Sequence, residues 1–123
     1  MGDSRKIKSF EDLVVWQESQ SLAVSVYQST KSFPKDEQFG LTNQLRRAVS
    51  SISANIAEGF GRQTDKDKKH FYTIAYGSLL EVKSFLYLSN KLQYMPESDL
   101  ENLLEHCTAC QKLINASKRA FRS

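Results

Sequence analysis

Two cysteines spaced three residues apart form the pattern in this sequence that most resembles redox or metal chemistry. Cys107 and Cys110 match the motif C-x-x-C. That motif is reactive when a thiolate lies at a helix N-terminus, and it binds zinc when a second pair of ligands completes the site. The chain has no other cysteine, and both residues fall in the middle of a predicted helix, on its apolar side. We therefore expect small buried core residues and predict no metal site.

Histidine and serine side chains form no catalytic arrangement either. His70 and His106 fall on different predicted helices, and neither has a partner at a spacing that binds metal, so we expect both at the surface. Three serines lie close together, without the strand–turn–helix context of a nucleophile elbow: Ser50, Ser51 and Ser53. We expect these serines to let their helix approach a neighbour closely. The sequence predicts no catalytic residue, no cofactor and no enzymatic activity.

The segment Gly59-Phe-Gly61-Arg62 shares glycines and a cation with phosphate-binding loops. It follows a predicted helix rather than a strand and has too few glycines for that role. We interpret it as a structural turn in which Gly59 ends the helix with a positive φ. An anion held by Arg62 and the next helix N-terminus is the alternative. Asn55 is expected to be buried and hydrogen-bonded, and Glu58 is expected to pair with Arg62.

Four amphipathic helices must position these residues. Apolar residues recur with a helical period in four stretches, and no alternating strand pattern occurs. We predict a short basic segment over 1–9 and one domain over 10–123. The expected helices cover about 10–32, 35–58, 64–92 and 98–121. The expected N-caps are Ser9, Thr64 and Ser98. Short loops join antiparallel neighbours, so the sequence predicts an all-α, antiparallel up-down-up-down four-helix bundle.

Two of the helices have apolar residues on both sides. The expected core side of the first contains Leu13, Trp16, Ala23, Val24 and Tyr27. The expected core side of the third contains Phe71, Ile74, Ala75, Ser78, Val82, Phe85, Leu86 and Ser89. One bundle cannot bury both sides of a helix, so the remaining apolar residues predict an oligomer interface: Val15, Leu22, Val26, Tyr72, Tyr76, Leu80 and Tyr87. Stacking of the tyrosines against nucleic-acid bases is the alternative.

The charge is uneven along the predicted bundle. The chain has 17 Lys and Arg against 14 Asp and Glu, a net charge of +3. Antiparallel helices would gather the excess where the first and third helices begin and the second and fourth end. The candidate phosphate-binding residues there are Arg62, Lys66, Lys68, Lys69, Lys118 and Arg119, with Arg5, Lys6, Lys8 and Arg122 nearby. This pole predicts contact with the backbone of RNA or DNA, and a solvated charge pattern without a ligand is the alternative.

No membrane association is expected. No apolar run approaches the roughly 18 residues that a membrane span needs. The N-terminus, MGDSRKIKSF, lacks the apolar stretch of a signal peptide. Two cysteines suit a reducing compartment, and we predict a cytoplasmic protein.

Several stretches resemble the 23S rRNA-intervening sequence protein family. They are FEDLVVWQ from Phe10, Phe33-Pro34, FGL from Phe39, and QLRRAVSSISANIAEGFGR from Gln44 to Arg62. The resemblance continues through Phe71, Gly77-Ser78-Leu79 and Glu81, and so covers nearly the whole chain. Its most specific part is Asn55-Ile-Ala-Glu-Gly59 with Arg62.

The resemblance implies a bacterial four-helix bundle without enzymatic activity. The family is similar to the accessory variability determinant protein of diversity-generating retroelements, a basic pentameric barrel that binds nucleic acid and a reverse transcriptase. It therefore implies a homo-oligomer, specifically a pentamer. It assigns no molecular role and no catalytic or ligand residue. Our leading hypothesis is an oligomeric protein that contacts RNA or DNA through its basic pole, and the alternative is a structural adaptor for a protein partner.

Overall fold

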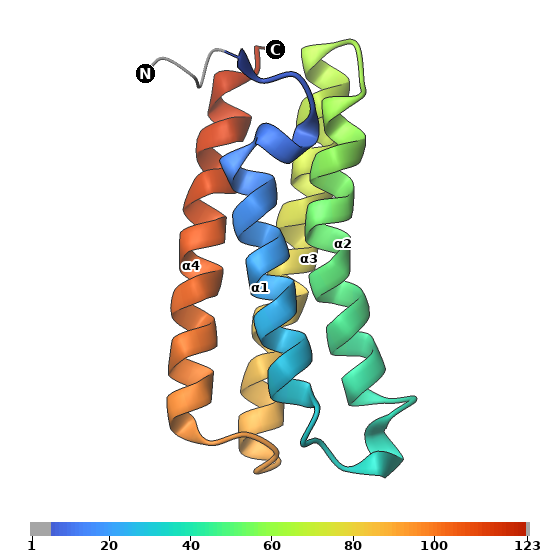
Figure 1. Ribbon diagram of the computed structural model, residues 1–123, viewed down its shortest axis with the longest axis vertical. Coiled ribbons are helices and arrows are strands. Elements are labelled where there is room, and N and C mark those ends of the chain that lie inside the picture. The colour runs from blue at the N-terminus through green and yellow to red at the C-terminus, as the bar shows by residue number, and fades with distance from the viewer. Residues whose placement is uncertain (1–5, 123) are drawn as a thin grey trace.

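Four long helices make up most of the chain (Figure 1). The computed structural model describes residues 6–122, and its helices are α1 (Val14–Thr30), α2 (Leu41–Phe60), α3 (Asp65–Lys91) and α4 (Glu97–Ala120). Two 3₁₀ helices precede α1 and α2, namely η2 (Phe10–Asp12) and η3 (Lys35–Glu37). Residues 6–122 contain no strand, so the predicted all-α fold is confirmed. No helix in this range has the length and apolar character needed to cross a membrane.

Successive helices run in opposite directions and pack side by side (Figure 1). α1 contacts α2 and α4, and α3 also contacts α2 and α4. α1 and α3 therefore occupy diagonal corners of the bundle, and their outer faces point in opposite directions. The α2–α3 turn lies at the same end of the bundle as the start of α1 and the end of α4.

The first helix begins later than predicted because Leu13 interrupts it. Leu13 has an extended conformation, with φ −78° and ψ 125°, and separates η2 from α1. The Asp12 carboxylate accepts hydrogen bonds from the backbone N–H groups of Lys8 (2.9 Å) and Ser9 (3.2 Å). These bonds lower the pKa of Asp12 and fix the turn that leads into α1.

Of the three predicted N-caps, Thr64 caps the predicted helix, whereas Ser9 precedes η2 rather than α1. The Thr64 hydroxyl accepts a hydrogen bond from the backbone N–H of Asp67 at 3.1 Å, and α3 starts as predicted. α4 instead has Pro96 as its N-cap, so Ser98 lies inside the first turn and does not cap the helix. The predicted start of the second helix at residue 35 is also wrong, because η3 and a further turn come first.

α2 and α4 each bury one apolar side. The buried residues of α2 include Leu41, Leu45, Ala48, Val49, Ile52 and Ile56. Those of α4 include Leu100, Leu103, Cys107, Cys110 and Ile114. They form one continuous hydrophobic cluster with α1 and α3, which is the main source of the bundle's stability.

α1 is rotated from its predicted orientation. Leu13, Trp16 and Ala23 are partly buried against the core, as predicted. Leu22 and Val26 are fully buried, whereas Val24 and Tyr27 are 56% and 41% exposed. Ser19 also faces the core, and its hydroxyl donates a hydrogen bond to the Val15 carbonyl at 2.7 Å. A buried hydroxyl satisfied in this way costs little, so the core side of α1 can contain residues that count as polar by type.

α3 is rotated slightly from its predicted orientation. Tyr72 and Leu79 are buried, with 3% and 0% of their surface exposed, although neither belongs to the predicted core side. Ile74, which does belong to it, is 38% exposed. Phe71 and Phe85 are half-buried at the edge of the core. The other predicted core residues are confirmed: Ala75, Ser78, Val82, Leu86 and Ser89.

Candidate nucleic-acid interface

The helix ends that carry the candidate cations lie at one end of the bundle (Figure 1). The described residues place nine basic side chains there: Lys6, Lys8, Arg62, Lys66, Lys68, Lys69, Lys118, Arg119 and Arg122. Five acidic side chains share this end: Glu11, Asp12, Glu58, Asp65 and Asp67. The difference is +4. Arg5 was also predicted here, but it lies outside the described residues.

Two of the candidate cations hold the α2–α3 turn together. Arg62 forms the predicted salt bridge with Glu58 at 2.7 Å, and its guanidinium carbon lies 4.6 Å from the centre of the Phe71 ring. Lys68 donates a hydrogen bond from Nζ to the Phe60 carbonyl at 2.9 Å. A cation near the last carbonyls of α2 also interacts favourably with the negative end of the helix dipole. These two side chains therefore stabilise the fold, apart from any contact with a ligand.

The remaining candidates are better placed to meet a ligand. Lys118 has its ammonium group 5.9 Å from the centre of the Tyr76 ring, which is a loose cation–π contact. Within residues 6–122, Lys66, Lys69 and Arg119 form no side-chain hydrogen bond or salt bridge. Lys66 and Arg119 are exposed, and Lys69 is half-buried. Cations of this kind can neutralise phosphate groups without breaking an internal contact.

The N-terminus of α3 does not offer a free anion site. Thr64 caps one backbone N–H, and Asp65 and Asp67 place two carboxylates in the first turn. Asp65 also accepts a hydrogen bond from the backbone N–H of Arg122 at 3.0 Å, which ties the end of the chain to this turn. The alternative of an anion bound between Arg62 and this helix end is therefore not favoured, because carboxylates already occupy the positive end of the dipole.

Gly59 has a different role from the one predicted. It is a helical residue inside α2, and no glycine in the described part of the chain has a positive φ. A Cβ at this position would lie 3.0 Å from the Phe71 Cβ and 3.4 Å from the Lys68 carbonyl oxygen. Gly59 is therefore needed for the close approach of α2 and α3, and the helix ends at Phe60 with Gly61 as its C-cap.

Asn55 is hydrogen-bonded, as predicted, but only half-buried. Its Nδ2 donates to the Ser51 carbonyl at 2.8 Å and to the Ser51 hydroxyl at 2.9 Å. The Ser51 hydroxyl in turn lies 2.9 Å from that of Ser78 on α3. The expected close approach to a neighbouring helix is supported for Ser51, which meets Ser78 of α3. Ser53 instead accepts a hydrogen bond from Gln20 of α1, and Ser50 is exposed.

The cysteines are buried free thiols, as predicted. Burial raises the pKa of Cys107 to about 12 and that of Cys110 to about 11, which makes both thiols unreactive. His70 is exposed as predicted, whereas His106 is half-buried with its Nε2 3.7 Å from a carboxylate oxygen of Glu18. Residues 6–122 contain no cluster of side chains that would hold a metal ion.

Four of the seven predicted interface residues are in the core. Val15, Leu22, Val26 and Tyr72 are at most 5% exposed, because α1 and α3 are turned from their predicted orientations. The remaining predicted residues are on the surface: Tyr76, half-buried, and Leu80 and Tyr87, 45% and 47% exposed. The outer face of α1 carries other apolar residues: Val14, Val24 and Tyr27. An apolar face on each of these helices therefore persists, with partly different members.

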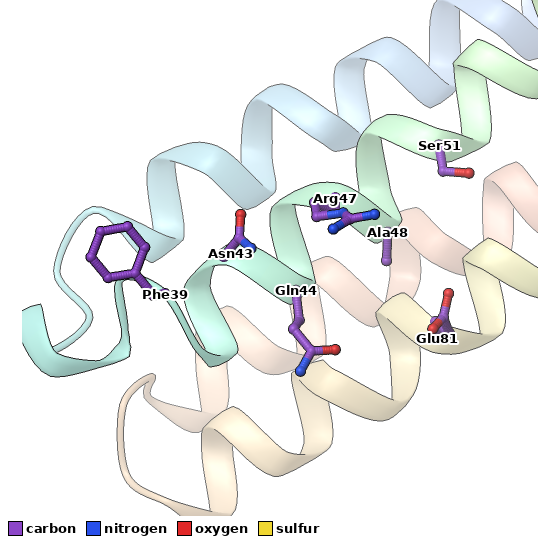
Figure 2. Close-up of a pocket in the computed structure, with 7 residues that line it drawn as sticks. All are labelled: Phe39, Asn43, Gln44, Arg47, Ala48, Ser51 and Glu81. Atoms are coloured by element: carbon purple, nitrogen blue, oxygen red, sulfur yellow. The ribbon is translucent and has the colours of Figure 1, made fainter.

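A groove between α2 and α3 was not anticipated. Figure 2 shows Phe39 at one end, Arg47 along α2 and Glu81 on α3. Its full lining is Phe39, Asn43, Gln44, Arg47, Ala48, Ser51 and Glu81, and its volume is about 510 Å³. Phe39 and Glu81 are 42 positions apart in the chain, so only the packing of α2 against α3 brings them to one surface.

The family's sequence model for 23S rRNA-intervening sequence proteins matches residues 11–116. The chain belongs to this family. A crystal structure of a protein with unknown function from the S23 ribosomal protein family of Bacteroides thetaiotaomicron VPI-5482 is also similar. The TM-score is 0.80 and the identity 24%, over 87% of this chain and 96% of that chain. That likeness supports the four-helix fold alone. The curated proteins contain no match.

Membership covers the helices that form the basic pole and the α2–α3 groove. The matched range contains α1, α2 and α3 entirely, and α4 up to residue 116. Lys118 and Arg119 lie beyond it. The match to the 23S rRNA-intervening sequence proteins thus spans most of the helical framework and leaves out two of the candidate cations.

Proposed function

We propose that this protein is a non-enzymatic, oligomeric, cytoplasmic protein that associates with RNA or DNA through its basic pole. The observation that carries the proposal is the grouping of cations from three helix ends on one surface, with Lys66, Lys69 and Arg119 free of internal partners among residues 6–122. The family name refers to 23S rRNA, which supports a nucleic-acid association.

The pole is suited to phosphate groups rather than to base edges. Its cations are on flexible side chains at helix ends, and no element of the described chain projects from this end to enter a groove of a duplex. Lysine and arginine contacts of this kind position a protein on nucleic acid without reading its sequence. We therefore expect binding that depends strongly on salt and weakly on sequence.

Two apolar faces on diagonal helices support self-association. Val24 and Tyr27 are exposed on α1, and Leu80 and Tyr87 are exposed on α3. Because α1 and α3 do not contact each other, these faces point away from one another. Contact between the α1 face of one copy and the α3 face of the next is head-to-tail, and such contacts close into a ring when the rotation permits. A pentamer is the ring size that we propose from the family resemblance.

A ring built in this way would place every basic pole on the same side. The bundle axes of neighbouring copies would be roughly parallel, so the +4 at each pole would be repeated around one rim. Several weak phosphate contacts that act together bind far more tightly than one. Oligomerisation would thus compensate for the modest net charge of +3 per chain.

A structural adaptor for a protein partner is the second candidate. The exposed aromatic residues support it, because Tyr and Phe are enriched at protein interfaces. On this reading the partner would cover an apolar face and the basic pole would remain solvated.

Binding to labelled RNA and DNA at several salt concentrations tests the proposal. The triple variant Lys66→Glu, Lys69→Glu, Arg119→Glu should weaken binding to all sequences, because three cations would become anions at the pole. The matched control reverses three lysines at the opposite pole, Lys31, Lys35 and Lys91, and should change affinity little. For duplex DNA, each lost phosphate contact should reduce the salt slope by about 0.9.

Equal losses from the two triple variants would indicate general attraction to a basic protein and contradict a site at the pole. The absence of any binding at low salt would favour the adaptor.

A further inference from the structure

The α2–α3 groove contains polar side chains that the fold does not use. Asn43, Gln44, Arg47 and Glu81 are exposed and form no side-chain hydrogen bond or salt bridge with other residues in 6–122. Arg46, the neighbour of Arg47, behaves differently. Its guanidinium donates to the Thr30 hydroxyl at 2.9 Å and lies over the Tyr27 ring. The groove is therefore a surface where a cation, two amides and a carboxylate are all available.

Phe39 is the most exposed large apolar side chain of the groove, with 88% of its surface open to solvent. The backbone that carries it is held firmly. One oxygen of the Glu37 carboxylate accepts a hydrogen bond from the Leu41 N–H at 3.0 Å, and the other accepts one from the Tyr94 hydroxyl at 2.9 Å. Gly40 leaves room for the Glu37 carboxylate, since a Cβ at position 40 would lie 2.7 Å from its Oε1. The ring is thus presented from a fixed turn.

The lining offers partners for the face of a base, the edge of a base and the phosphate of a nucleotide. An exposed aromatic ring offers a face for base stacking, and an unpaired guanidinium offers a partner for phosphate. A carboxylate accepts hydrogen bonds from the amino and imino groups of bases, and it disfavours phosphate at its own end of the groove. In Figure 2, Arg47 lies between Phe39 and Glu81, so an extended strand would meet these groups in turn. The volume of about 510 Å³ falls in the range of sites for small ligands.

We propose that the α2–α3 groove binds an unpaired stretch of nucleic acid, with a base stacked on Phe39, a phosphate at Arg47 and the N–H groups of a following base at Glu81. This inference rests on the proposed association with nucleic acid, but it uses a different surface from the basic pole. It adds a preference for single strands, since bases in a duplex are already stacked and paired.

Fluorescence anisotropy with a labelled single-stranded RNA of about 12 nucleotides, and with a duplex of the same sequence, tests the groove. Phe39→Ala should weaken single-strand binding about 5-fold to 100-fold, because stacking on one aromatic side chain contributes that much. The same variant should leave duplex binding unchanged. Phe39→Trp should restore single-strand binding, since it keeps an aromatic face. Arg47→Ala should reduce the single-strand salt slope by about 0.7.

The results separate the groove from the pole. Loss of single-strand preference in Phe39→Ala with duplex binding intact supports the groove, even if the triple variant at the pole shows no effect. Unchanged single-strand affinity in Phe39→Ala overturns the groove proposal and leaves the pole untouched. A fall in the assembly mass of Phe39→Ala, measured by light scattering without RNA, would also overturn it, because Phe39 would then belong to a contact between copies.

Discussion

Lys68 of α3 donates a hydrogen bond from its ammonium group to the backbone carbonyl of Phe60, 2.9 Å away, and so joins the last turn of α2 to the first turn of α3. Lys66, two residues earlier, makes no such contact within the described chain. The two lysines carry the same charge at the same pole, but only Lys68 forms a hydrogen bond that stabilises the fold.

We therefore predict that substitution of Lys68 lowers both protein stability and nucleic-acid affinity, whereas substitution of Lys66 lowers the affinity alone. Lys68→Met should lower the free energy of unfolding by about 1 kcal/mol, because a carbonyl at the end of α2 loses its donor. Lys66→Met should leave stability unchanged. Both variants should weaken nucleic-acid binding, Lys66→Met through charge alone. Urea unfolding followed by circular dichroism measures the first effect, and equal stability of the two variants would show that the Lys68 bond contributes nothing.

Gly59 and Gly77 form a matched pair for the packing of α2 against α3. Gly59→Ala should destabilise the protein by about 1 kcal/mol, because overpacking against Phe71 outweighs the better helix propensity of alanine. Gly77 lies in α3, where an added Cβ would meet no atom within 4 Å, so Gly77→Ala should stabilise by about 1 kcal/mol. Thermal unfolding of both variants measures the contrast. Stabilisation by Gly59→Ala would disprove the close approach.

Head-to-tail assembly predicts an outcome for mixed variants. Val24→Glu on α1 and Tyr87→Glu on α3 should each dissociate the oligomer to chains of 14.0 kDa and leave the helical content intact, since both residues are about half exposed. Mixing the two variants should give a dimer, because one copy keeps its α3 face and the other its α1 face. Light scattering after size-exclusion chromatography reports the masses.

Ala109→Glu, on the exposed side of α4, is the control and should keep the assembly mass of the unaltered chain. A monomeric unaltered chain at micromolar concentration would exclude self-association through these faces.

The buried thiols predict resistance to modification and a loss of stability at high pH. Cys107 and Cys110 have pKa values of about 12 and about 11, above the ordinary value of 9.0, so the folded state favours the neutral thiol. Their stabilising effect is fully present below pH 9 and is lost as the pH rises toward 11 and 12. A thiol reagent at pH 8 should label neither cysteine until urea unfolds the chain. Rapid labelling of one thiol in the folded protein would contradict its burial.

The sequence predicted the fold and the location of the charge because both follow from helix count and short loops. It misplaced the core side of α1 because Ser19 and Thr30 lie there. Their hydroxyls bond to the carbonyls of Val15 and Val26 within the same helix, so they are buried at little cost, whereas residue-type hydropathy counts them as polar. Val24 and Tyr27, which belong to the predicted side, are exposed instead.

Gly59 and the α2–α3 groove were beyond sequence reasoning for another reason. A glycine near the end of a helix suits either a left-handed stop or a close approach, and only the distance to Phe71 decides between them. The groove depends on how far α2 slides along α3, which sets Phe39 and Glu81 on one surface. Helical periodicity predicts which side of each helix is buried, but it does not predict how far α2 is displaced along α3.

The uneven charge of the bundle should favour nucleic-acid binding but disfavour assembly of neighbouring chains. The described residues of the far pole include Lys31, Lys35 and Lys91 against five acids, Asp36, Glu37, Glu97, Asp99 and Glu101, so each chain is an electric dipole along its axis. Chains packed side by side with their poles aligned repel one another, and salt relieves that repulsion while it weakens phosphate binding. Ring formation should therefore strengthen with ionic strength as nucleic-acid binding weakens. A bound strand would itself neutralise the basic rim, so nucleic acid should promote the assembly that holds it.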